Sequence, residues 1–211
     1  MSSANYEIFA DAFGSGGDSN LSSLNYFMVG STGEVAMGFA ESSSFRLNSG
    51  VPSIKRQPSI GITVSPDQIS LGMLSSTSVA SNSHGISSYS NSKTGYVLKV
   101  YGETLTTAAT DDIDAIGASS AASNPGTEQF GINLVANTVP AVGAAPVLRK
   151  AIIDADYGTV NQFAFLDGDT MATATKPSND TFTASYIANI SAGTAAGQYE
   201  TLITFSVTSN F

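Results

Sequence analysis

Cysteine and tryptophan are absent from this sequence of 211 residues, and histidine occurs once. Without cysteine the chain has no disulfide, no thiolate nucleophile and no Cys-ligated zinc or iron–sulfur site. Charged residues make up only 12% of the chain, about half of their usual share in soluble globular domains. Serine, threonine, glycine and alanine take their place, which is typical of a β-rich surface protein whose exposed faces carry hydroxyl groups rather than charges.

The charges that are present are mostly acidic, with 8 basic side chains against 17 acidic ones and a net charge of −9. Proteins bind phosphate backbones and anionic membranes through clusters of Lys and Arg. The scattered basic residues of this chain offer no such cluster. No apolar run approaches the roughly 20 residues needed to cross a bilayer. We therefore expect no nucleic-acid partner and no membrane span.

Composition also bears on where the protein works. Small secreted domains of eukaryotes depend on disulfides, so a secreted chain without cysteine points to a bacterium or an archaeon. The sequence opens on strand-like residues and shows no secretory leader. We expect that a signal peptide was removed before this numbering began, and that the protein is extracellular or lies at the cell surface.

Short strand-like segments separated by turn-forming residues fill most of the chain, and helical periodicity is nearly absent. Segment 181–190 shows the pattern most clearly, because every second residue is apolar, as in a half-buried antiparallel strand. The strand-like segments are 60–64, 68–74, 95–103, 128–136, 161–166, 181–190 and 198–207. They predict an all-β fold, namely an immunoglobulin-like or jelly-roll β-sandwich with an N-terminal strand-repeat extension.

Two local predictions accompany this fold. The last two strand-like segments, 181–190 and 198–207, are joined by the turn-rich sequence SAGTAAG and are expected to form a hairpin. Segment 106–124 is the least strand-like part of the chain, and it is expected to hold a helical turn or a long loop.

The first fifty residues repeat a short phrase. Serine pairs begin at Ser2, Ser22 and Ser42, and each pair is followed by an aromatic and then an aliphatic residue. We interpret the repeat as three short strands separated by glycine-rich turns at 14–19 and 30–34.

The domain organisation follows from this repeat and from the segment after it. Residues 51–59 carry two prolines and a basic pair, which is typical of a linker. The predicted domains are a strand-repeat arm over 1–50, a linker over 51–59 and the sandwich over 60–211.

The repeated phrase supports a family resemblance. The pattern of an S-x-N-Y strand, a glycine turn, a second S-x-N-Y strand and a G-E-x-A-x-G link resembles an N-terminal module of secreted surface proteins from candidate-phyla-radiation (Patescibacteria) bacteria. From Ser65 onward the chain is similar to the Ig-like β-domains that follow such modules. The third unit departs from the pattern, with Ser44 and Phe45 in place of Asn-Tyr. The resemblance implies a secreted or cell-surface β-protein and transfers no catalytic residue.

Catalytic patterns are weak. The single histidine, His84, lies in the polar stretch SNSHGIS, and no G-x-S-x-G motif accompanies it, so we interpret it as a surface or strand-edge residue rather than part of a Ser–His–Asp site. Paired carboxylates such as Glu103, Glu128, Asp154 and Glu200 suit glycoside hydrolysis. Without tryptophan the aromatic platforms that bind sugars are few, so these acids are interpreted as solvated or turn-capping. We expect no enzyme activity.

Calcium is the strongest small-ligand hypothesis, because loop carboxylates at alternate positions offer the oxygen ligands that Ca²⁺ prefers. The candidates are Asp154, Asp156, Asp167 and Asp169, beside the cluster Asp111, Asp112 and Asp114. The spacing does not fit an EF-hand loop, and Asp is also common in β-turns. No cofactor is expected, with calcium as the exception to test.

Three functions from different classes remain open. The first is a self-assembling subunit of a surface filament or surface layer, in which copies of the chain join by β-strand addition. Its donor strand would place Tyr6, Ile8, Ala10 and Ala12 on one face. The second is a monomeric adhesin or carbohydrate-binding module with a glycan partner, and the third is a secreted hydrolase. Composition and the weak catalytic patterns favour the first.

Overall fold

The computed structural model divides the chain into two compact units, Met1–Gln57 and Pro58–Phe211. The structure describes residues 16–22, 27–32, 38–42, 44, 46–49, 57–209 and 211. Each unit is described by itself. The division falls inside the segment that the sequence marks as a linker.

The first unit contains two antiparallel hairpins, β1–β2 and β3–β4. Their strands are β1 (Gly16–Ser22), β2 (Phe27–Thr32), β3 (Gly38–Glu41) and β4 (Arg46–Ser49). The predicted turns at 14–19 and 30–34 are wrong over their described residues, because Gly16 pairs with Thr32 and Asp18 with Gly30 inside the first hairpin. Glycine keeps both backbone hydrogen-bonding groups, so a glycine-rich segment pairs as a strand when a partner is near.

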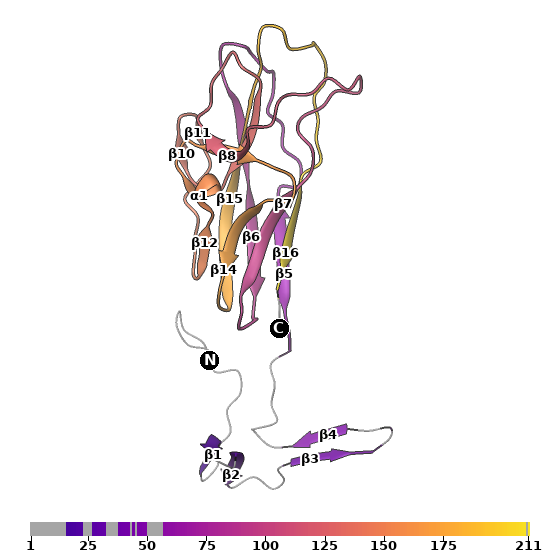
Figure 1. The fold of residues 1–211 in the computed structure, drawn as a ribbon, viewed down its shortest axis with the longest axis vertical. Helices are drawn as coiled ribbons and strands as arrows, with labels where there is room; N and C mark the ends of the chain where they lie inside the picture. Colours follow the sequence, from indigo (N-terminus) through magenta and orange to yellow (C-terminus); the bar gives the residue numbers. More distant parts are fainter. Residues whose placement is uncertain are drawn as a thin grey trace. The chain divides into compact units, whose positions relative to one another are not determined.

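The second unit is a sandwich of two antiparallel sheets, which confirms the predicted all-β sandwich (Figure 1). The larger sheet has the order β5-β6-β15-β9-β13-β8 and the smaller one β12-β14-β7-β16. The bounds are β5 (Ile60–Ser65), β6 (Ala80–Ser90), β7 (Tyr96–Tyr101), β8 (Gly117–Ala121), β9 (Gln129–Asn133), β12 (Ala151–Ile153), β13 (Phe163–Phe165), β14 (Thr170–Ala174), β15 (Ser178–Asn189) and β16 (Thr204–Thr208). A small hairpin, β10 (Asn137–Thr138) with β11 (Ala141–Val142), and one helical turn, α1 (Ala155–Gly158), complete the unit.

Two local predictions are wrong. The predicted strand at 68–74 is irregular, with only an isolated bridge just after it between Ser75 and Ser78. The predicted hairpin does not form either, because β15 pairs with β6 and β9 while β16 pairs with β7 in the other sheet. The connection over 190–203 therefore crosses from one sheet to the other. Segment 106–124, predicted as a helical turn or a loop, contains β8.

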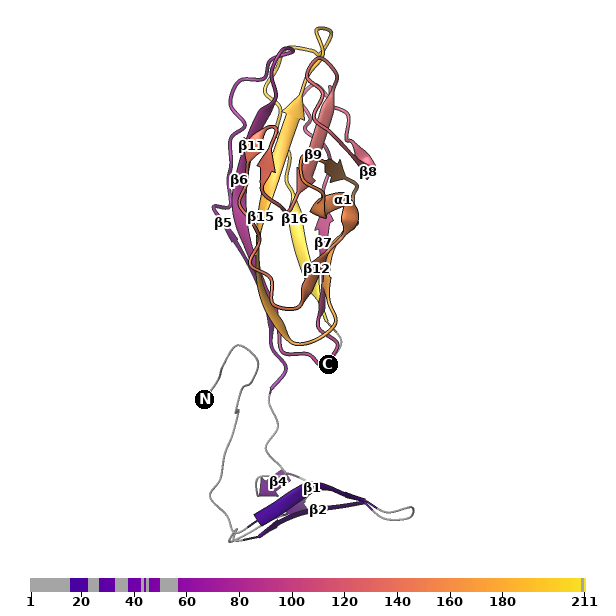
Figure 2. The same ribbon diagram turned by 90° about the vertical axis from the view of Figure 1, so that its left-hand side faces the viewer.

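The core lies between the two sheets. The rings of Phe130 and Phe165 meet edge to face with their centroids 5.1 Å apart, an arrangement that aromatic pairs favour. The long strands β6 and β15 run most of the length of the sandwich (Figure 2). Every second residue of β6 from His84 to Ser90 is buried, so a strand rich in serine supplies one wall of the core.

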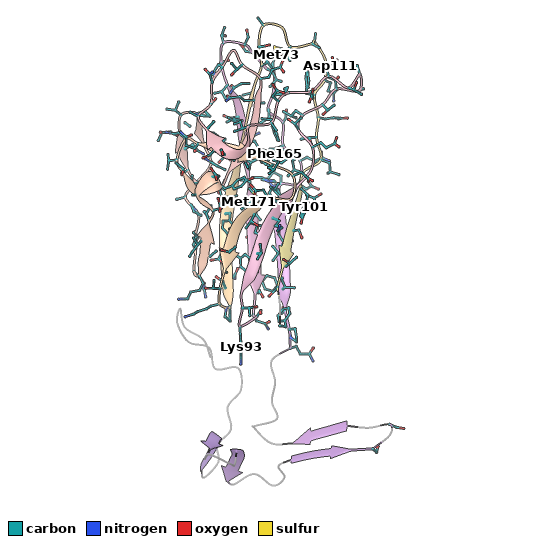
Figure 3. The ribbon with its side chains drawn as sticks, in the orientation of Figure 1. Met73, Lys93, Tyr101, Asp111, Phe165 and Met171 are labelled. Carbon is teal, nitrogen blue, oxygen red and sulfur yellow. The ribbon has the colours of Figure 1, made fainter. Side chains whose placement is uncertain are left out.

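The two ends of the sandwich differ in construction. One end, the basal end, carries the tight turns 91–95 and 175–177, which are adjacent because Ala174 pairs with Tyr96 and Ser178 with Ser90. The opposite, apical end carries the long loops 102–116 and 190–203, which hydrogen-bond to each other through the backbones of residues 106 and 200. Figure 3 shows Asp111 and Met73 at the apical end and Lys93 at the basal end.

Candidate functional site

One long side of the sandwich is open. Strands β5 and β16 are the outermost strands of their sheets and lie against each other. Each forms a ladder with one neighbour only, β5 with β6 and β16 with β7. Within the described residues no strand pairs with the outer side of either. Figure 1 shows β12 and α1 along the other long side of the sandwich. We call the side formed by β5 and β16 the open edge.

Apolar side chains follow the open edge without being fully covered. Of the twelve partly buried hydrophobic residues that pack against the core, nine belong to β5, to β16 or to the segments beside them. They are Ile60, Ile62, Val64, Ile69, Leu71, Leu74, Ile203, Phe205 and Val207. By contrast, Leu98 of β7 and Ile86 of β6 are 0% exposed. Side chains at the centre of the core are therefore fully buried, whereas those along this edge are only partly buried.

The open edge also lacks the features with which proteins protect exposed strands. Natural edge strands are commonly shortened, twisted, or guarded by charges and proline. The sequences of β5 (IGITVS) and β16 (TFSVT) contain no charge and no proline. The edge strand β12 has three residues and lies between Lys150 and Asp154. The other outermost strand of the larger sheet, β8 (GASSA), is also free of charge and proline, but α1 contacts it. We therefore consider the open edge the side best suited to accept another strand.

The single histidine lies behind the open edge. His84 is 8% exposed, so the prediction of a surface or strand-edge histidine is wrong. Its Nδ1 lies 2.8 Å from the carbonyl oxygen of Pro66 and its Nε2 lies 2.9 Å from the hydroxyl of Tyr186. A carbonyl only accepts, so Nδ1 carries a proton and donates to Pro66, and Nε2 shares a hydrogen bond with the Tyr186 hydroxyl. The ring also faces Phe205 of β16, with centroids 5.8 Å apart. Both nitrogens are occupied, which leaves no free base for nucleophile activation.

A buried carboxylate organises the basal end. Asp180 is 0% exposed, and its Oδ1 accepts from the backbone N–H of Arg149 at 2.6 Å while Oδ2 accepts from the Tyr96 hydroxyl at 2.7 Å. Burial raises the pKa of Asp180, but hydrogen bonds from Ser178, Tyr96 and two backbone N–H groups lower it more, so the pKa lies below its usual value. Burial and the adjacent carboxylate raise the pKa of the Tyr96 phenol. All of these donors are backbone groups or side chains of the sandwich itself, so we interpret the network as structural.

The first pair of calcium candidates is engaged at the helical turn α1. Asp154 caps the turn, with its Oδ1 accepting from the backbone N–H of Asp156 at 3.0 Å. Asp156 Oδ1 accepts from the backbone N–H of Ser120 at 2.8 Å, and that hydrogen bond holds the pKa of Asp156 below its usual value. These acids connect α1 to β8 of the larger sheet.

The second pair is engaged at the turn between β13 and β14. Asp167 Oδ1 accepts from the backbone N–H of Gly102 at 2.9 Å. Asp169 Oδ2 accepts from the Tyr157 hydroxyl at 3.0 Å, and burial together with Asp169 raises the pKa of that phenol. Within the described part of the chain, no three acidic or histidine side chains gather in a group that would hold a metal ion. Calcium binding stays a prediction.

Two of the four paired-carboxylate candidates come together. Glu103 and Glu200 line an open apical cleft of about 260 Å³. Both side chains are exposed, whereas the acid of a glycosidase needs surroundings that keep it protonated. Glu128 accepts hydrogen bonds from Ser191 and Thr194 instead, and Asp154 lies at α1. The cleft therefore has paired carboxylates without the environment that glycoside hydrolysis requires.

The donor-strand candidates Tyr6, Ile8, Ala10 and Ala12 lie outside the described residues. The open edge itself was missed by sequence reasoning, and its local signal was two uncharged, proline-free apolar segments, 60–65 and 204–208. The described part of the chain includes no helix with the length and apolar character needed to cross a membrane. No protein-family model, no curated protein and no solved structure matches this chain.

Proposed function

We propose that this chain is a non-enzymatic extracellular structural protein, a self-assembling subunit of a surface filament or surface layer whose copies join by β-strand addition. The observation that carries the proposal is the open edge. Among the described residues, no strand pairs with the outer side of β5 or β16, and half-buried apolar side chains lie along both strands. An added strand gains main-chain hydrogen bonds from such an edge and buries alternate side chains against it.

The occupant we propose is the N-terminal segment of a second copy. That segment supplies Tyr6, Ile8, Ala10 and Ala12 at alternate positions, and side chains two apart point to the same face of a strand. Its two charged residues, Glu7 and Asp11, fall at the odd positions and therefore on the opposite face of the strand. Exchange between different surfaces of identical copies is head to tail, and it yields a polymer when the rotation from one copy to the next does not close a ring.

The proposal is tested by comparing the full chain with a variant lacking residues 2–13, using light scattering and negative-stain microscopy. We expect the full chain to form large assemblies and the variant to stay monomeric with an unchanged thermal unfolding transition. A monomer in both samples contradicts the proposal and leaves the adhesin or carbohydrate-binding module as the alternative. In that case binding to glycans and to Ca²⁺ is the next measurement.

A further inference from the structure

The charges of the sandwich are separated along its long axis. Of its five basic residues, four lie on exposed segments at the basal end: Lys93, Arg149, Lys150 and Lys176. Lys93 and Lys176 occupy the two tight turns, and the backbone of Lys150 is bonded to Ser178 at the start of β15. The basal segments 91–95, 143–150 and 175–177 contain no acidic residue. The basal end is therefore a surface of one sign.

The apical end carries the opposite charge. Seven acidic residues lie on three segments that run to this end, 66–79, 102–128 (which includes β8) and 190–203, and none of these segments contains Lys or Arg. The acids are Asp67, Glu103, Asp111, Asp112, Asp114, Glu128 and Glu200. Three of these acids surround one phenol. Burial raises the pKa of Tyr199, and the negative charges of Asp111, Glu128 and Asp112 raise it further. Figure 3 shows the separation through Asp111 at one end and Lys93 at the other.

The acidic end alone does not indicate what binds there. The four cations at the basal end do indicate a partner, because a second copy of the chain carries the complementary charge. Copies that carry a net charge of −9 repel each other in most orientations. Apical-to-apical and basal-to-basal contacts bring like charges together, and like-charge contacts are costly at interfaces. The apical-to-basal contact is the arrangement in which the Coulomb interaction between two copies is attractive.

We infer that the acidic apical end of one copy receives the basic basal end of the next, so that the copies stack head to tail. The inference rests on the proposed function and adds the direction of assembly to it. The apical surface also offers apolar contact, since Met73, which Figure 3 shows at this end, is 95% exposed. The linker enters the sandwich at the basal end, because Ser59 is hydrogen-bonded to Asn91 of a basal turn. In such a stack, the chain enters each sandwich at the end that meets its neighbour.

Complementary charge reversal tests the inference. One variant, E103K/E200K, makes the apical end more basic, and a second, K93E/K176E, makes the basal end more acidic. All four side chains are exposed, so folding should be unchanged. Each variant alone weakens the attraction, because the reversed apical end keeps five acids against two lysines and the reversed basal end has two basic side chains against two acidic ones. We expect its critical concentration for assembly to rise about tenfold or more at low salt. An equimolar mixture should form mixed pairs, because the unchanged apical end of K93E/K176E then meets the unchanged basal end of E103K/E200K.

The matched control is the variant that carries all four reversals in one chain. Its net charge stays at −9, since two substitutions add the positive charge that the other two remove. It should still assemble less well than the natural chain, because its two ends no longer carry opposite charges, and this loss at unchanged net charge assigns the effect to where the charges lie. The natural assembly should weaken between about 0.05 and 0.5 M NaCl as the Debye length shortens. Assembly of both reversed variants at the natural concentration overturns the inference and leaves the proposed function intact. A natural chain that is monomeric at every salt concentration overturns both.

Discussion

The phenol of Tyr96, on the four-stranded sheet, donates a hydrogen bond of 2.7 Å to the buried carboxylate of Asp180 on the six-stranded sheet. This bond joins the two layers of the sandwich near the basal end. The same carboxylate accepts from the backbone N–H of Arg149, so it also fixes the segment that leads into β12. A single buried charge thus connects three parts of the fold.

Replacing this carboxylate should make stability less dependent on pH. The folded chain holds the pKa of Asp180 below its usual value, so the unfolded chain takes up the proton at a higher pH. Stability from the ionised group is complete above the usual Asp pKa and is lost as the pH falls through the lowered one. We expect D180N to cost about 2–4 kcal/mol at pH 7, and less at pH 2, measured by urea unfolding.

The variant Y96F is the control for that experiment. It removes one donor and keeps the ionised carboxylate with its backbone donors, so its cost should be smaller, about 1–2 kcal/mol at pH 7. Equal destabilisation of D180N at pH 7 and pH 2 would show that shape, rather than ionisation, is what this position supplies.

The hydrogen bond between Tyr186 and His84 should appear as a coupling energy. The variants H84F and Y186F each leave a buried polar atom without its partner, while the double variant removes both polar atoms together. We expect each single variant to lose about 1–3 kcal/mol of unfolding free energy and the double variant to lose less than the sum. Strict additivity in a double-mutant cycle would contradict this assignment of the buried pair.

Two glycines with similar backbones should respond differently to alanine. Gly95 has φ +74° and a Cβ there would lie 1.9 Å from the carbonyl oxygen of Ala174, whereas Gly72 has φ +77° with nothing within 4 Å. Both substitutions place alanine in the left-handed region, at a cost of about 1 kcal/mol. G95A adds a backbone clash between the two basal turns and should lose about 2 kcal/mol or more beyond G72A. Thermal unfolding of the pair measures the difference, and equal costs would contradict it.

The fold class follows from the sequence, but the strand pairing does not. Alternation identified β15, and short apolar segments identified β5, β7, β9 and β13. Strand β6 was missed, because its core-facing positions include His84, Ser88 and Ser90, and these residues read as a loop. The hairpin between 181–190 and 198–207 was wrong because the turn-rich connection spans two sheets, and nothing local distinguishes a hairpin from a crossover of that length.

The candidate site depends even more on long-range arrangement. The apolar residues of β5 and β16 are visible in the sequence, yet their exposure follows from both strands being outermost in their sheets. Likewise, Lys93 and Lys176 become one basal surface only because β6, β7, β14 and β15 bring their turns together. Of the acids proposed for calcium, Asp156 and Asp167 each accept a hydrogen bond from a residue distant in the sequence, Ser120 and Gly102.

Charges placed on the open edge should block assembly without harming the fold. Thr63 of β5 and Thr204 of β16 are exposed, and lysine on an edge strand opposes pairing with another strand. We expect T63K/T204K to remain folded and monomeric in sedimentation velocity. The matched control is A118K/S119K, which adds two lysines to exposed positions of β8 and should assemble normally. Equal loss of assembly in both variants would assign the effect to net charge rather than to the open edge.

Strand addition between copies is tested most directly by disulfide trapping, which a chain without cysteine permits. One chain carries A10C in the N-terminal segment and the other carries T204C on the open edge, and the mixture is oxidised mildly. A disulfide requires Cβ atoms about 3.8 Å apart, so A12C and I8C are tried in place of A10C to cover the strand register. The account predicts a covalent dimer between the two different chains, seen on a non-reducing gel. A third sample carries both cysteines in one chain. A disulfide that forms within that chain, and never between the two singly substituted chains, would contradict the account.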